Sequence, residues 1–82
     1  MNRKEYLELC ETVAKIPPGI AGIKEVPEEL TVMYNGVSYW PSSYEMRFDR
    51  DGNHYDVAVL HDLKANSVTH AILKNVNSRR DY

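Results

Sequence analysis

The sequence predicts an α+β fold, in which an N-terminal amphipathic helix is followed by an antiparallel meander of about five strands. Apolar residues recur every three or four positions up to residue 16, as in a helix, and every second position from residue 30 onward, as in strands. Asn-Gly and Asp-Gly pairs, which are typical of hairpin turns, separate the alternating runs. A curled sheet of this size could close into an SH3-like small barrel.

Length and composition restrict the chain to one small domain spanning residues 1–82. A chain of 82 residues can form one thin core, which excludes a large enzyme architecture. Its single cysteine cannot form an internal disulfide, and no apolar run is long enough for a membrane span or a signal peptide. We therefore expect a cytoplasmic protein without a membrane partner.

The helix is expected over residues 2–16. Asn2 can cap its first turn, and Pro17 and Pro18 prevent its continuation. The apolar stripe consists of Tyr6, Leu9, Cys10, Val13 and Ile16. Because Cys10 lies within this stripe, we interpret it as a small core residue and not as a reactive thiol.

Residues 17–29 contain three of the four prolines and two glycines, so we expect an irregular crossing without helix or strand. The first hairpin follows at Asn35-Gly36, a pair suited to a two-residue type I′ turn. In that register Tyr34 faces Val37 and Val32 faces Tyr39. Met33 and Trp40 then lie on the opposite side of the ribbon.

A second hairpin is expected around residues 50–53, with Phe48 facing Tyr55 on the core side and Arg47 facing Asp56 on the other. The strands would occupy residues 30–76, and a turn at 63–66 would lead to a last strand from residue 67 to about 76. Residues 77–82 carry no apolar pattern and are expected to be a mobile tail.

Catalytic patterns are not found in the sequence. His54, His61 and His70 do not have the spacing of a closed zinc site, because they offer at most two ligands on one side of the sheet. The serines lack a nucleophile-elbow context, and the paired acidic residues lie in turns. We therefore expect a non-catalytic protein without metal or cofactor.

The candidate partner-binding residues are Met33, Trp40, Leu60 and Arg47. The first three are expected on the same outward face of the sheet, with Arg47 beside them, and such apolar and aromatic groups with a charged rim are typical of protein interfaces. Either the helix or the 17–29 segment covers this face, or it is an exposed patch that marks a partner site. The sequence leaves that choice open, as it leaves open a homo-oligomer.

A small nucleic-acid- or nucleotide-binding domain is the alternative function, again on an SH3-like barrel. It requires clustered positive charge, for which Arg50, Lys74, Arg79 and Arg80 are the candidates. Ten basic residues against twelve acidic ones give a net charge of −2, which favours protein binding.

Three segments carry a resemblance to a protein group: Leu60 to Thr69, Tyr39-Trp40-Pro41, and Phe48-Asp49 with Asp51-Gly52. In these segments the chain resembles short uncharacterised proteins encoded in prophages and mobile elements of Gram-positive bacteria. The resemblance implies a phage accessory protein, and such proteins commonly bind a host protein and occasionally bind nucleotides or DNA.

Overall fold

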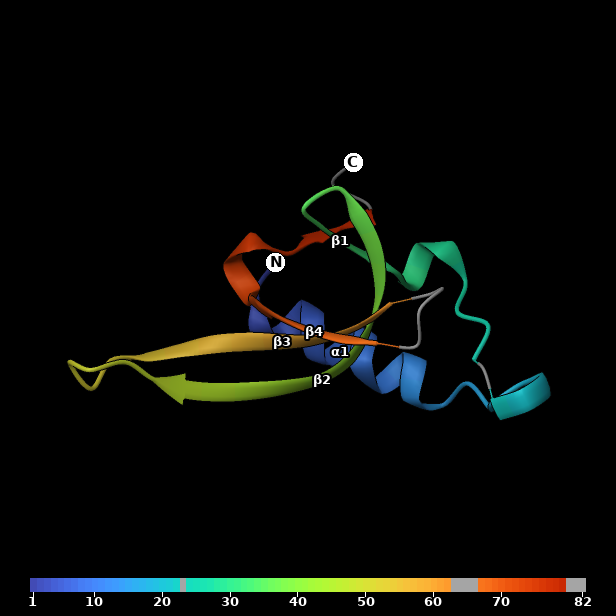
Figure 1. Cartoon of the computed structure of the whole chain (residues 1–82), viewed down its shortest axis with the longest axis horizontal. Coiled ribbons are helices and arrows are strands. Elements are labelled where there is room, and N and C mark those ends of the chain that lie inside the picture. Colours follow the sequence, from blue (N-terminus) through green and yellow to red (C-terminus); the bar gives the residue numbers. More distant parts are fainter. Residues whose placement is uncertain (23, 63–66, 80–82) are drawn as a thin grey trace.

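A computed structural model describes residues 1–22, 24–62 and 67–79 (Figure 1). One N-terminal helix is followed by a five-stranded antiparallel sheet of order β4-β3-β2-β1-β5, which confirms the predicted α+β class. The elements are α1 (Arg3–Ala14), β1 (Val32–Tyr34), β2 (Val37–Phe48), β3 (His54–Asp62), β4 (Val68–Ile72) and β5 (Asn77–Ser78), with single 3-10 turns η1 (Ile20–Gly22), η2 (Glu28–Leu30) and η3 (Leu73–Asn75).

The first helix begins where the cap was predicted. The Asn2 side chain accepts a hydrogen bond of 2.8 Å from the backbone N–H of Glu5. The helix ends at Ala14, two residues earlier than predicted, and Lys24 donates to the carbonyl oxygen of Val13 at 3.0 Å. The segment after the helix therefore returns to its C-terminus, and it contains the turns η1 and η2 where no regular element was predicted.

Tyr6 fixes α1 onto the sheet. Its side chain is fully buried, and its hydroxyl lies 2.8 Å from the carbonyl oxygen of Ser43 and 3.0 Å from that of Val59. At this place the register between β2 and β3 shifts, because β2 carries a bulge between Pro41 and Ser43. The core under the helix consists of Tyr6, Val32, Ala58, Leu60, Ala71, Leu73 and Val76.

The first hairpin has the predicted register: Tyr34 pairs with Val37, and Val32 pairs with Tyr39. Asn35 and Gly36 adopt φ angles of 51° and 75°, as a type I′ turn requires. Trp40 therefore lies on the face opposite Val32, as predicted.

The second hairpin differs from the prediction by one residue. Phe48 pairs with His54 and Arg47 pairs with Tyr55, whereas Phe48 was expected to face Tyr55. The reason is the loop, in which Gly52 has a φ of 83° and its N–H donates to the carbonyl of Asp49. A three-residue loop of this kind places the glycine in a bulge, which shortens the link by one residue.

Strand β2 is longer than predicted, and the predicted last strand is divided. Residues 37–48 form one curved strand, whose hairpin with β3 extends beyond the helix (Figure 1). The chain from 67 to 76 forms β4 and then η3, because Leu73 and Val76 are both buried at a spacing that suits a 3-10 turn.

The predicted mobile tail from residue 77 is wrong for its first part. Asn77 and Ser78 form β5, which pairs with β1, and Arg79 makes side-chain hydrogen bonds. The rest of the predicted tail, residues 80–82, and the predicted turn at 63–66 lie outside the described residues. Strands β4 and β5 are the two edges of an open sheet, so closure into an SH3-like barrel is not confirmed. Within the described ranges, no helix is long and apolar enough to cross a membrane.

Candidate functional site

Trp40 lies on the outer face of the sheet, the face turned away from α1. Its ring stacks on that of His61, with centroids 4.3 Å apart, and the ammonium of Lys24 lies 5.7 Å from its centroid. Lys24 belongs to the 17–29 segment, so that segment covers part of Trp40, which is half-buried. Met33 is on the same face and half-buried, and the hydroxyl of Ser38 contacts its sulfur at 3.2 Å.

Leu60, expected beside Trp40, is instead fully buried in the core under α1. Trp40 pairs with His61, the next residue of β3, so the side chain of Leu60 points to the opposite face. The expectation failed because Val57 to Leu60 are four consecutive apolar residues, all buried, and alternation cannot assign the face of such a run. Leu60 is therefore no part of an outward-facing site.

Arg47 lies on the outer face but does not face Asp56 as predicted. Its guanidinium forms an ion pair of 2.7 Å with Glu45, two residues away on the same strand. Asp56 pairs instead with Arg3 of α1 at 3.2 Å and accepts a hydrogen bond from the hydroxyl of Tyr44. The one-residue shift of the hairpin causes both changes.

The outer face borders on a free strand edge at β4. β3 pairs with β4 in a constant register from Val57–Ile72 to His61–Val68. Next to this ladder, the N–H of Asp62 donates to the carbonyl of Ser67 at 2.9 Å. Backbone groups alternate in direction along a strand, so Thr69 and Ala71 also bond to β3.

It follows that the backbone groups of Val68, His70 and Ile72 point away from the sheet. Among the described residues no strand lies on that side of β4. The side chains of these three residues are also exposed, Val68 by 50% and Ile72 by 41%. We name the outward groups of these three residues, together with the groove beside them, the edge surface.

The groove lies on the outer face beside the edge and has a volume of about 310 Å³. Val57 is buried at this place, while Tyr55, Arg47 and Ile72 are exposed around it. The lining residues are Arg47, Tyr55, Val57, His70, Ala71 and Ile72. A side chain of a segment bound along β4 can enter this groove.

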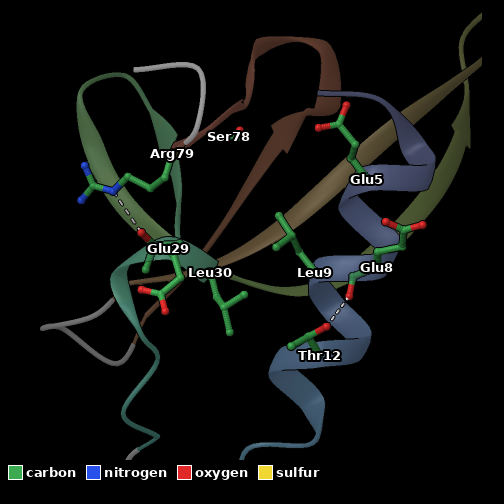
Figure 2. Close-up of a pocket in the computed structure, with 9 residues that line it drawn as sticks. Glu5, Glu8, Leu9, Thr12, Glu29, Leu30, Ser78 and Arg79 are labelled. Atoms are coloured by element: carbon green, nitrogen blue, oxygen red, sulfur yellow. Dashed lines mark hydrogen bonds between the residues drawn. The ribbon is translucent and has the colours of Figure 1, made fainter.

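A second hollow, of about 200 Å³, lies between α1, η2 and the end of β5 (Figure 2). Leu9 and Leu30 point into the gap, and Glu5, Glu8 and Glu29 lie around it. These carboxylates form no ion pair within the described part of the chain. The hollow therefore combines an apolar floor with negative charge.

Arg79 forms one side of this hollow and is held in place. The Arg79 Nε donates to the Thr31 hydroxyl at 3.1 Å. The Arg79 Nη2 donates to the Ser38 hydroxyl at 2.7 Å and lies 3.3 Å from the carboxylate of Glu28. The Arg79 guanidinium is therefore engaged within the fold.

The other nucleic-acid candidates are separated from Arg79. Arg50 lies in the tip of the β2–β3 hairpin, and Lys74 lies in η3 before the chain reaches β5. Arg80 lies outside the described residues. Arg79 and Lys74 line different hollows and Arg50 lines neither of these two, whereas a phosphate-binding surface needs grouped cations.

Burial and hydrogen bonds within the fold shift the pKa values of several described groups. Burial raises the pKa of the Cys10 thiol, and burial together with the nearby Cys10 raises that of the Tyr6 hydroxyl. The hydrogen bond from Tyr44 and, to a smaller extent, Arg3 lower the pKa of Asp56. A Cys with a raised pKa is less often a thiolate and therefore a weaker nucleophile.

A metal-binding group of three or more His, Cys, Asp or Glu side chains is absent from residues 1–22, 24–62 and 67–79. His54 and His61 lie on opposite faces of β3, as expected from their separation by seven residues.

Comparison with protein-family models, with curated proteins and with solved structures gave no match to this chain. The resemblance to prophage-encoded proteins therefore stays a prediction.

The edge surface is the feature that sequence reasoning missed. The signal was present, because residues 68–72 read Val-Thr-His-Ala-Ile, which combines high strand propensity with the absence of Lys, Glu, Asp and Pro. Free edges of natural sheets are commonly protected by such charges, by proline or by bulges. The sequence could not show that this strand is at an edge, since the order of strands is a tertiary property.

Proposed function

We propose that this chain is a non-catalytic protein-interaction module, which binds an extended segment of a partner protein along the free edge of β4. The single observation that carries the proposal is the row of outward N–H and C=O groups at Val68, His70 and Ile72 beside an apolar groove. In strand addition, backbone hydrogen bonds provide affinity and a neighbouring pocket for every second side chain provides specificity.

The two edges of the sheet support the choice of β4. The edge strand β5 is two residues long, and short edge strands offer little to pair with. The edge strand β4 is five residues long, keeps a regular register with β3, and carries no fixed charge. Of the two edges that the structure describes, β4 therefore offers a partner strand of five residues the longer hydrogen-bonding edge.

The chemistry of the groove indicates what the segment should carry. Val57 and Ile72 favour an apolar side chain, and the Arg47 guanidinium beside them is already paired with Glu45, so an uncharged segment suits the groove. If the chain is encoded by a prophage, as the resemblance implies, the partner is a host protein. Nothing in the placement of Arg50, Lys74 and Arg79 favours the nucleic-acid alternative.

The test uses randomised peptides displayed on phage and selected against the whole chain. Selected peptides should slow exchange of the amide protons of Val68, His70 and Ile72, whose N–H groups point away from β3. His70→Pro should abolish binding, because proline removes an outward N–H and blocks approach to the edge without removing a bond to β3. His70→Ser is the matched control that keeps the N–H and should still bind. Peptides that bind His70→Pro as well as the natural chain would refute the proposal.

A further inference from the structure

The edge of β4 is symmetric about His70 in a way that suits a second copy of itself. The three residues with outward backbone groups are evenly spaced, with a β-branched aliphatic residue at each end and His70 in the middle. When two such strands run antiparallel with His70 opposite His70, Val68 of each copy faces Ile72 of the other. Each of these pairs exchanges two N–H···O bonds, which gives about six in all.

From this match we infer that the chain forms a two-fold symmetric homodimer, in which β4 pairs with β4 of a second copy about His70. The inference rests on the proposed function, because the second copy occupies the same edge of β4 and would compete there with a segment of a host protein. The pairing joins two five-stranded sheets into one continuous sheet, and the interface uses the same surface on both copies, as two-fold symmetry requires.

The side chains of β4, like its backbone groups, favour pairing with a second copy. Val68, His70 and Ile72 all lie on the outer face, so Val68 and Ile72 of the two copies form two apolar cross-strand pairs beside the central histidines. No Lys, Arg, Asp or Glu of β4 opposes a like charge across the two-fold axis. The exposure of Val68 and Ile72, 50% and 41% in the single chain, would fall when the second strand is added.

The charge of β4 also favours a second copy of this strand over a strongly charged segment. The segment 68–72 is uncharged apart from any charge on His70, and it meets a strand with the same composition, so neither copy must bury a fixed charge. The groove beside Ile72 in each copy lies on the face where Val68 of the other copy projects, which gives this residue an apolar contact.

The first experiment is sedimentation of the whole chain over a wide concentration range. The natural chain and His70→Ser should associate to dimers, whereas His70→Pro should raise the dissociation constant at least about tenfold. A dimer that persists unchanged in His70→Pro overturns the inference, because another surface must then hold the copies together. A chain that stays monomeric at all concentrations overturns it as well.

The second experiment tests the register and does not depend on the folding of the proline variant. In a Cys10→Ser background, His70→Cys should cross-link two chains, since directly opposed residues place their Cα atoms about 5.5 Å apart, within the range of a disulfide. Val68→Cys is the matched control with an exposed position on the same strand. Two copies of residue 68 lie about 14 Å apart in this register, four positions along the strand, and should not cross-link.

The two experiments separate this inference from the proposed function. Equal cross-linking at both positions, or cross-linking at position 68 alone, overturns the His70-centred pairing. If the chain is monomeric but His70→Pro still abolishes binding of the selected peptides, the proposed function stands and the second copy is not the occupant. If neither association nor peptide binding depends on the edge, both proposals fail.

Discussion

Removal of one hydroxyl group, by Tyr6→Phe, is expected to weaken the attachment of the helix to the sheet. The Tyr6 hydroxyl is the donor for two carbonyl oxygens, those of Ser43 and Val59, at the bulge of β2. Phenylalanine keeps the buried ring but leaves these oxygens without this donor. Because one proton serves both acceptors, the loss is counted once. A buried polar group left without a partner costs about 1–3 kcal/mol, so we expect a loss of about 2 kcal/mol.

The measurement is unfolding by urea, which gives the free energy, and by heat, which gives Tm, both followed by circular dichroism. For a domain of this size, about 2 kcal/mol corresponds to a fall in Tm of roughly 8–16 °C. Tyr34→Phe is the matched control, because the Tyr34 ring packs against Tyr39 but its hydroxyl makes no hydrogen bond within the described residues; its stability should stay within about 0.5 kcal/mol of the natural chain. If Tyr6→Phe is as stable as this control, the hydroxyl does not hold the bulge and the reasoning is refuted.

Three other predictions concern the hairpin and the outer face. The hydrogen bond from Tyr44 and the nearby Arg3 lower the pKa of Asp56 below its ordinary value of 3.8. The ionised Asp56 therefore stabilises the fold fully above pH 3.8, and this stabilisation is lost as the pH falls through the lowered pKa. The difference in Tm between the natural chain and Asp56→Asn should shrink on acidification, and a constant difference would contradict this. Gly52→Ala should cost about 1–2 kcal/mol in thermal unfolding, since its φ of 83° is unfavourable for alanine, while Gly52→Asn should cost less. Trp40→Ala should lower the free energy of unfolding by about 2 kcal/mol, less than the loss of a fully buried aromatic residue, because Trp40 is half-buried against His61. Complete shielding of the Trp40 fluorescence from iodide in a monomer would contradict a half-buried position.

Local signals were sufficient where a structure depends on a few neighbouring residues. The cap at Asn2 is such a case, because its side chain bonds three residues along the chain. The Asn35-Gly36 turn is another, because it requires two residues with positive φ and then determines the pairing of Val32 with Tyr39. The same register placed Trp40 opposite the core face.

The second hairpin shows where local reasoning became ambiguous. Apolar pairing of Phe48 with Tyr55 and charge pairing of Arg47 with Asp56 agreed on one register, yet the loop conformation at Gly52 produced another. The distal half of this hairpin extends beyond the helix, so its apolar residues are not required to face a core. A one-residue shift there exposes Phe48 without a large loss of buried surface.

The sequence by itself determined the helix, the first turn, the five-stranded antiparallel class and the outward position of Trp40. Only the tertiary structure decided that Leu60 is core, that Arg79 is held by Glu28 and Thr31, and that β4 is a free edge. The first set depends on periodicity and on turns, which are encoded within a few residues. The second set depends on which distant segments lie side by side, and a strand carries the same residues whether its outer edge is paired or free.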